Sequence, residues 1–325
     1  MPVRVVVPAG GIGAARFLRG LKAALPADAD ITVIGNTGDD ITLFGLRICP
    51  DLDTVMYTLG GGIEESQGWG RAGETFVVKE ELAAYAAEPT WFGLGDRDLA
   101  THLVRTQMLD AGYPLSEVTA ALCARWRPGV RLLPMTDDRV ETHVVIEDEQ
   151  GRRAVHFQEY WVRLRAAPPA LEVVPVGAAD AKPAPGVLEA IAAADLVLLP
   201  PSNPVVSIGL VLAVPGIRDA LGATSAPMVG VSPIIGAAPV RGMADKVLAA
   251  IGVETSAEAV ARHYAARAAG GLLDGWLVDT ADADAADALS AVGLPARAVP
   301  LLMSDLDATT AIAQAALELA EAVRR

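Results

Sequence analysis

The sequence lacks the features that mark secreted, zinc-binding and membrane-spanning proteins. It has only two cysteines in 325 residues, Cys49 and Cys123, and their spacing fits neither a disulfide framework nor a paired-thiol zinc site. No stretch of about 20 residues is apolar throughout, so no membrane span is expected. The first residues also lack the basic-then-apolar layout of a signal peptide. We therefore expect a cytoplasmic protein whose cysteines are reduced and buried.

Positive charge is also scarce. Lysine and arginine total 26 against 40 acidic residues, which gives a net charge of −14. That charge repels nucleic acid and anionic membrane surfaces, so neither is expected as a partner. A phosphorylated substrate would need local positive groups or a metal ion. Because 52% of the residues are hydrophobic and 20% are charged, the chain is expected to fold as a globule.

The first 35 residues have the pattern of a strand, a glycine turn, a helix and a second strand. Val3 to Val7 is a continuous apolar run, as in a strand that is buried on both faces of a parallel sheet. A glycine-rich turn follows, then a helical pattern over Ala14–Leu25 and an apolar run over Ile31–Ile34. This is a βαβ unit, and its crossover is expected to be right-handed.

The second half repeats this alternation. Strand-like runs lie at Leu196–Leu199, Met228–Val231, Trp276–Val278 and Ala298–Leu302. Helical patterns lie at Val187–Ala193, Met243–Ile251, Ser256–Ala268 and Ala308–Val323. Such alternation predicts an α/β fold with a doubly wound, mainly parallel, Rossmann-like sheet. The sheet is expected to use residues 1–61 and 169–325 as a nucleotide-binding core.

Residues 62–168 interrupt the alternation and are expected to form an inserted subdomain. Their helical patterns lie at Phe76–Ala87, Asp96–Ala111 and Ser116–Trp126, the last with Ser116 as its cap, and a hairpin is expected over Val140–Ile146 and Arg153–Trp161. Eleven of the fifteen aromatic residues lie between Tyr57 and Trp161. This aromatic-rich insertion is either a lid over a planar ligand or a small second core.

The glycine turn is the first candidate site. Gly10, Gly11 and Gly13 lie between a strand and a helix, where backbone N–H groups and the helix N-terminus can bind phosphate. Arg16 would add a charged contact one turn later. However, Arg16 occupies the third glycine position of a dinucleotide fingerprint, and no acid follows the second strand to hold a ribose. The turn therefore predicts phosphate or nucleotide binding rather than a nicotinamide oxidoreductase.

An acidic cluster follows the second strand. It comprises Asp39, Asp40, Asp51 and Asp53, four carboxylates within fifteen residues. Open α/β sheets bind ligands at the carboxyl ends of their strands, and oxygen-rich sites with few carboxylates suit Mg²⁺. Asp51 also fits a turn or helix-cap residue. Asp39 and Asp53 are the preferred metal and substrate contacts.

Three further loops are candidates for substrate contacts. Asp96 either caps a helix or touches a ligand. Ser202 and Asn203 follow one later strand, and a segment from Ser232 to Gly236 follows the next, so the two loops could clasp a nucleotide. The sequence has no Gly-x-Ser-x-Gly elbow, and its four histidines are scattered singly. Chemistry is therefore expected from metal and positioning, as in phosphoryl transfer.

Taken together, these segments resemble the 2-phospho-L-lactate transferase family over residues 5–320. The motifs that carry the resemblance are Gly10-Gly11-x-Gly13, Asn36-x-Gly38-Asp39-Asp40, Ile48-Cys49-Pro50-Asp51-Leu52-Asp53-Thr54, Leu94-Gly95-Asp96-Arg97-Asp98, Pro201-Ser202-Asn203-Pro204 and Ser232-Pro233-Ile234-Ile235-Gly236. The resemblance implies an enzyme of coenzyme F-420 biosynthesis. It would move phosphoenolpyruvate or 2-phospho-L-lactate from a guanosine diphosphate conjugate to the ribityl hydroxyl of 7,8-didemethyl-8-hydroxy-5-deazariboflavin and release GMP.

The resemblance also implies roles for individual residues and a homodimer. Asp39 and Asp53 would hold Mg²⁺ and serve catalysis, with Asp53 and Thr54 also near the substrate. The inserted subdomain, residues 62–168, would bind the acceptor through the loop that holds Gly93, and the Ser202 and Ser232 loops would face the guanosine nucleotide. Alanine-rich composition and glycine-rich stretches look actinobacterial, which favours the phosphoenolpyruvate donor. A related branch of the superfamily implies an alternative, a regulatory protein that binds nucleotide sugars without transfer.

Overall fold

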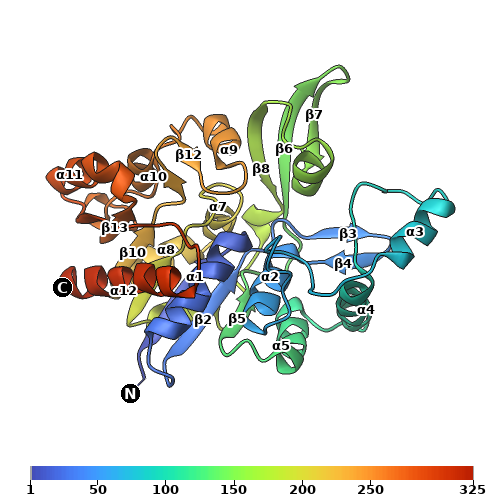
Figure 1. Cartoon of the computed structure of the whole chain (residues 1–325), viewed down its shortest axis with the longest axis horizontal. Coiled ribbons are helices and arrows are strands. Elements are labelled where there is room, and N and C mark those ends of the chain that lie inside the picture. Colours follow the sequence, from blue (N-terminus) through green and yellow to red (C-terminus); the bar gives the residue numbers. More distant parts are fainter. Residues whose placement is uncertain (1, 325) are drawn as a thin grey trace.

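The computed structural model describes residues 2–324, and its centre is a seven-stranded parallel sheet (Figure 1). The strand order is β14-β13-β10-β9-β1-β2-β5. The strands are β1 (Arg4–Ala9), β2 (Asp30–Gly35), β5 (Arg131–Pro134), β9 (Leu196–Leu199), β10 (Met228–Val231), β13 (Gly275–Val278) and β14 (Ala296–Ala298). The predicted parallel α/β sheet is thus confirmed.

Alternate residues of the buried strands face two separate hydrophobic cores. In β1, Val5 and Val7 belong to one core and Val6 to the other, because successive side chains of a strand point to opposite faces. Helices cover both faces, so the sheet is doubly wound. One face packs against α1 (Gly11–Ala24), α2 (Pro50–Leu59), α5 (Leu115–Trp126) and α12 (Leu306–Ala322). The other packs against α6 (Val187–Ala193), α7 (Ile208–Ala213), α8 (Ile217–Ala223), α9 (Ala244–Ala250), α10 (Ala257–Tyr264) and α11 (Ala283–Ala291).

The strand order reverses direction at β1. From β1 the chain goes to β2 on one side, whereas β9 returns on the other side, and Val5 pairs with Leu196 in register. The loops that leave β1 and β9 lead to α1 and α7 on opposite faces of the sheet, so a crevice is expected at the carboxyl ends of these two strands. That crevice is where open α/β sheets bind their ligands.

The middle of the chain contributes to several parts of the molecule. A hairpin of β3 (Ile41–Leu43) and β4 (Leu46–Ile48) projects from the core toward α3 (Val77–Ala84) and α4 (Asp96–Asp110), on the right of Figure 1. A three-stranded antiparallel sheet joins β6 (Glu141–Asp148), β7 (Gly151–His156) and β8 (Ala170–Val176). Residues 62–168 thus supply α5 and β5 to the core, while β8, which follows them, pairs with β6.

Several element boundaries differ from those predicted. Helix α5 begins at Leu115 after Pro114, so Ser116 is not its cap, and the Ser116 hydroxyl donates instead to Asp137 at 2.9 Å. Helix α10 ends at Tyr264 because Ala265 takes a positive φ of 60°. No helix within residues 2–324 has the length and apolar character needed to cross a membrane.

Candidate functional site

The glycine turn contacts the loop that follows β9. A Cβ on Gly13 would lie 2.1 Å from the carbonyl oxygen of Pro201, and one on Gly10 would lie 2.6 Å from the Cβ of Ser207. The Ser202 hydroxyl donates a 2.9 Å hydrogen bond to the carbonyl of Gly10. These glycines therefore permit a close approach of two backbones. The structure brings Gly10, Gly13 and Ser202 together, at the switch point of the sheet.

Asn203 shapes its own loop. Its side-chain oxygen accepts from the N–H groups of Val205 and Val206 at 2.9 and 3.2 Å. Such a side-chain turn fixes the local backbone of the loop. Asn203 thus lies beside the crevice, with its oxygen directed into the loop.

The N-terminus of α1 already faces a carboxylate. Asp51, in the first turn of α2, is buried and accepts from the Gly11 N–H and, at 2.9 Å, from the Asn36 side chain. Burial raises the pKa of Asp51 to about 6, although the Asn36 hydrogen bond opposes the rise. Asn36 also donates to the carbonyl of Val206 at 3.2 Å. Asp51 therefore links the β1, β2 and β9 loops through hydrogen bonds.

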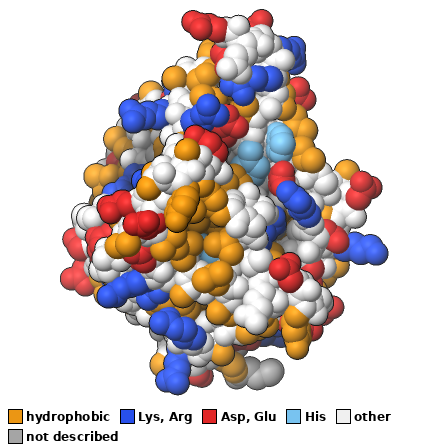
Figure 2. All heavy atoms as spheres, turned by 90° about the vertical axis from the view of Figure 1, so that its right-hand side faces the viewer, with side chains coloured by type: hydrophobic (Ala, Val, Ile, Leu, Met, Phe, Trp, Pro, Cys, Tyr) orange, Lys and Arg blue, Asp and Glu red, His pale blue; other side chains and the backbone are white. Residues whose placement is uncertain are grey.

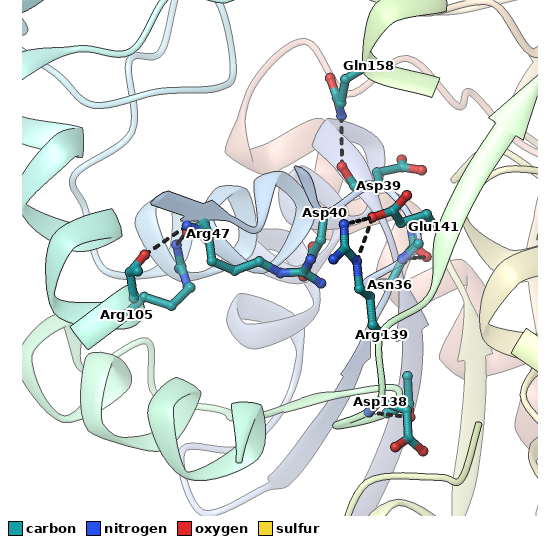
Figure 3. A network of polar contacts seen from close by, with 12 residues as sticks. Asn36, Asp39, Asp40, Arg47, Arg105, Asp138, Arg139, Glu141 and Gln158 are labelled. Carbon is teal, nitrogen blue, oxygen red and sulfur yellow. Dashed lines mark hydrogen bonds and ion pairs between the residues drawn. The ribbon is translucent and has the colours of Figure 1, made fainter. Parts of the chain in front are cut away.

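Asp39 and Asp40 are buried in the loop that follows β2. Burial, and then the nearby Asp51, raises the pKa of Asp39 well above its usual range. Burial raises the pKa of Asp40 to about 6, although Arg47 opposes this effect across a 3.1 Å ion pair. Figure 3 shows Arg47 reaching toward Asp40 from the β3–β4 hairpin. Asp39 has no ion pair with any residue from 2 to 324.

Asp53 belongs to a second buried network. Its Oδ1 forms an ion pair with Arg105 of α4, and its Oδ2 lies 3.8 Å from Nδ1 of His102. Burial raises the pKa of Asp53, and Arg105 opposes the rise. Nearby, the Tyr57 hydroxyl donates to Asp98 at 2.6 Å.

Sequence reasoning missed His102 and Arg105 of α4, placed Asp98 only within a motif, and took the histidines as isolated residues. Asp98, His102 and Arg105 lie at helical spacing within α4, which places them on one face of the helix. That spacing was the available signal. It could not reveal that the face packs against Asp53.

Within residues 2–324, three carboxylate oxygens of the acidic cluster have no hydrogen-bond partner. They are Oδ1 of Asp39, Oδ1 of Asp40 and Oδ2 of Asp53, and all are buried. Buried polar atoms are almost always satisfied, so these acceptors fit a cation. No three His, Cys, Asp or Glu side chains within residues 2–324 are arranged as metal ligands. A cation here would use one or two carboxylates and fill its shell with substrate or water oxygens, which is typical of Mg²⁺.

The β6–β7 hairpin holds the acidic loop through its backbone. The N–H of Thr142 donates to the carbonyl of Gly38 at 2.6 Å, and the Gln158 amide donates to that of Asp39 at 3.3 Å (Figure 3). Nε2 of His156 lies 3.1 Å from the carbonyl oxygen of Asp40. The rings of His143 and His156 are 5.7 Å apart, so these two histidines are paired rather than scattered.

Asp96 has a structural role in the described chain. Its carboxylate accepts from the Thr75 hydroxyl at 2.6 Å and from the N–H groups of Val77 and Val78 at 3.0 Å. It therefore caps α3 rather than its own helix. Glu74 in turn caps α4 by accepting from the N–H groups at its start.

Gly93 lies beside an apolar cavity in the same region. The cavity has a volume of about 330 Å³, and its aromatic walls are Phe44, Phe76 and Phe92. A Cβ on Gly93 would lie 3.3 Å from Nζ of Lys79, which also lines the cavity. Figure 2 shows hydrophobic side chains gathered on this face of the molecule.

The remaining candidates are spread along the carboxyl edge. The Ser232 hydroxyl donates to the carbonyl of Ile234 at 2.8 Å, and the Gly236 N–H donates to Asp282 at 2.9 Å. Thr54 is buried next to Asp53 on α2, and Arg16 is partly buried on α1. Ser232, like Asn203, shapes its own loop, which follows β10.

Comparison with known proteins gives consistent matches over nearly the whole chain. The family described as 2-phospho-L-lactate transferase CofD matches residues 5–298. A protein of Streptomyces griseus named phosphoenolpyruvate transferase is 71% identical over 322 residues, covering 99% of this chain and 100% of that protein. One of the same name from Thermobifida fusca is 69% identical over 325 residues, covering 98% of each.

The similarity to solved structures concerns the fold. A crystal structure of a UPF0052 family member from Bacillus halodurans has a TM-score of 0.63 and covers 98% of this chain and 99% of that one. The two sequences are 20% identical. The sheet and its helical layers are therefore shared with that protein.

Proposed function

Because this chain belongs to the 2-phospho-L-lactate transferase family, we propose that it transfers phosphoenolpyruvate from a guanosine diphosphate conjugate to 7,8-didemethyl-8-hydroxy-5-deazariboflavin. The family and the named relatives support a transferase of coenzyme F-420 biosynthesis. The choice of phosphoenolpyruvate over 2-phospho-L-lactate rests on relatives of that name at up to 72% identity. The activity is that of a transferase of substituted phosphate groups.

The proposed reaction is an in-line displacement at phosphorus. The ribityl hydroxyl oxygen forms a bond to the phosphorus that carries the enolpyruvyl group, and the bond from that phosphorus to the GMP oxygen breaks. GMP leaves with the bonding electrons, and the hydroxyl proton passes to a carboxylate. Positioning and charge stabilisation supply most of the catalysis in such transfers.

The observation that carries the proposal is the set of unpartnered carboxylate oxygens on Asp39, Asp40 and Asp53. Asp39 and Asp53 would hold Mg²⁺, which, when bound, neutralises charge on the diphosphate. The need is strong because the protein carries a net charge of −14. Asp39 or Asp53 is the candidate to accept the proton, because a cation bound nearby would favour the carboxylate form against the rise in pKa that burial causes.

The acceptor ring would occupy the cavity beside Gly93. Phe44, Phe76 and Phe92 supply apolar faces for a planar ring, and the cavity of about 330 Å³ falls within the usual range for small-molecule sites. Thr54 and the acidic loop would then lie on the side of the ribityl chain. The glycine turn and the loops after β9 and β10 would hold the nucleotide.

The proposal includes a homodimer in the cytoplasm. A reducing compartment agrees with the two cysteines, which are both free. Light scattering on the purified protein measures the oligomeric state, and a monomer mass would contradict the proposed homodimer.

The test is mass spectrometry of the products. Purified protein is mixed with the deazaflavin precursor, Mg²⁺ and a guanosine diphosphate conjugate that carries either the enolpyruvyl or the lactyl group. We expect GMP and the enolpyruvyl phosphodiester, with neither formed by an Asp39→Asn variant that retains its fold. Absence of both products with either donor would reject the function, whereas preference for the lactyl donor would revise the substrate.

A further inference from the structure

Two arginines from distant parts of the chain converge on one glycine. A Cβ built on Gly68 would lie 3.3 Å from Nη1 of Arg241 and 3.6 Å from Nη2 of Arg16. Arg16 lies in α1, and Arg241 follows the short strand β12 (Ala238–Pro239). Burial, and after it the charge of Arg241, lowers the pKa of Arg16. The two guanidinium groups are therefore close enough to repel each other.

The neighbouring acid does not neutralise this pair. Glu65 lies near Arg16, but both of its carboxylate oxygens accept from Arg19, at 2.8 and 3.0 Å. Within residues 2–324, neither Arg16 nor Arg241 forms an ion pair, and Arg241 donates only to the carbonyl of Gln67, at 3.0 Å. Two like charges are thus held together with no ion pair of their own among the described residues, and the nearby Glu65 is shared with Arg19. An anionic ligand would relieve that repulsion.

The pair lies on the side of the sheet where the substrate loops are. Helix α1 starts at the carboxyl end of β1, and the segment that carries Arg241 starts at the carboxyl end of β10 (Figure 1). Gly68 has a φ of +79°, and its Cβ position would also lie 2.9 Å from Cγ2 of Ile12. Position 68 therefore requires glycine, and no side chain at this position separates the backbone from the two guanidinium groups.

We propose that Arg16 and Arg241 form a clamp for the phosphates of a guanosine nucleotide. This inference rests on the proposed function, and it assigns the phosphate contacts of the donor to a pair of residues outside the acidic cluster. Guanidinium groups bind phosphate oxygens in a planar, two-pronged geometry, so two arginines match two adjacent phosphoryl groups. The same segment after β10 carries Ser232 and Arg241, so one loop can contact both the nucleoside and its phosphates.

Calorimetric titration with GDP tests the clamp. We expect Arg16→Gln and Arg241→Gln each to raise the Kd for GDP by about ten- to one-hundredfold, the range for losing a charge-assisted hydrogen bond. Arg262→Gln is the matched control: it removes the same charge from a surface pair with Glu258 and should leave the Kd within about twofold. Thermal unfolding of each variant checks that the fold persists.

A salt series separates a phosphate contact from a disturbed fold. Wild-type affinity for GDP should fall as salt rises, and the fall should be smaller in both clamp variants because a charged contact is missing. An unchanged Kd in both variants would overturn the clamp, and so would an unchanged salt dependence. If the wild-type protein forms product while the variants bind GDP normally, only the clamp is wrong. If GDP binds through the arginines and no product forms, only the proposed function is wrong.

Discussion

Arg105 and Asp53 form an ion pair in which both side chains are almost fully buried, with 2% and 6% of their side-chain surface exposed. Arg105 lies in α4, which stands beside the core, and Asp53 lies in α2, which packs on the sheet. The pair therefore joins α4 of the middle segment to α2 of the core. It also leaves one Asp53 oxygen, Oδ2, without a hydrogen bond.

Removing Arg105 should destabilise the protein strongly. Arg105→Met leaves the Asp53 carboxylate buried without its counter-ion, and such a change typically costs about 3–5 kcal/mol. Urea unfolding measures the loss. The exposed pair of Arg163 and Glu159 offers a matched control, because Arg163→Met should cost less than about 1 kcal/mol. Equal losses in the two variants would show that the buried pair contributes little.

Replacing Asp51 should stabilise the protein at neutral pH. Its pKa is about 6 in the fold but about 4 in an unfolded chain, so the unfolded state ionises first as pH rises. Stability is therefore lost between about pH 4 and pH 6, and the loss stays constant above that range. At pH 7, the free energy of unfolding of Asp51→Asn should exceed that of the wild type by on the order of 2–3 kcal/mol. At pH 4 the two free energies should be nearly equal.

Urea unfolding at the two pH values measures this difference. Asp28→Asn changes an exposed carboxyl and should leave the free energy of unfolding unchanged at both pH values. A variant of Asp51 that is less stable than wild type at pH 7 would mean that its hydrogen bonds to Gly11 and Asn36 outweigh the effect of burial.

The glycine turn should tolerate substitution unevenly. In Gly13→Ala the new Cβ would meet the backbone of Pro201 at 2.1 Å, which cannot move aside cheaply, so we expect a loss of about 1–3 kcal/mol. Gly11 has a φ of +70°, and its Cβ position meets only Oδ1 of Asp51, at 3.9 Å, so Gly11→Ala should cost about 1 kcal/mol. Thermal unfolding measures the stability of the two variants. A larger loss in Gly11→Ala than in Gly13→Ala would contradict the close contact between Gly13 and the β9 loop.

Asp96 should matter to stability more than to nucleotide binding. Asp96→Ala removes the cap of α3, a change that costs about 1 kcal/mol, while leaving the carboxyl edge of the sheet intact. Limited proteolysis should then cut first within residues 74–90, and the Kd for GDP should stay unchanged. A selective loss of GDP affinity would instead make Asp96 a substrate contact.

The sequence was most informative where the signal is local. Strand β9 has the predicted bounds Leu196–Leu199 because a strand buried on both faces is a short apolar run between polar loops. Helix α6 likewise spans Val187–Ala193 as predicted. Strand β14 ends at Ala298, where a strand over residues 298–302 was predicted, because apolar residues alone do not show which of them pair with β13.

The side-chain networks depend on contacts that no local pattern encodes. Arg105 and Asp53 are 52 residues apart, and Gln158 reaches Asp39 across 119 residues. Asp96 has the sequence pattern of a cap for α4, yet the packing of two helices turns it toward α3. The acids, glycines and loops were predictable as candidates. Their partners required the three-dimensional arrangement.

The β6–β7 hairpin and the residue just beyond it, Gln158, contact Gly38, Asp39 and Asp40 at their carbonyl oxygens. Their backbone is thereby held in place before any ligand arrives, while Oδ1 of Asp39 and Oδ1 of Asp40 have no hydrogen-bond partner within residues 2–324. A flexible loop would lose conformational entropy on binding, at roughly 1–2 kcal/mol for each residue it orders. Here that entropy is already lost on folding, so affinity for a cation or a diphosphate is not reduced by ordering the loop.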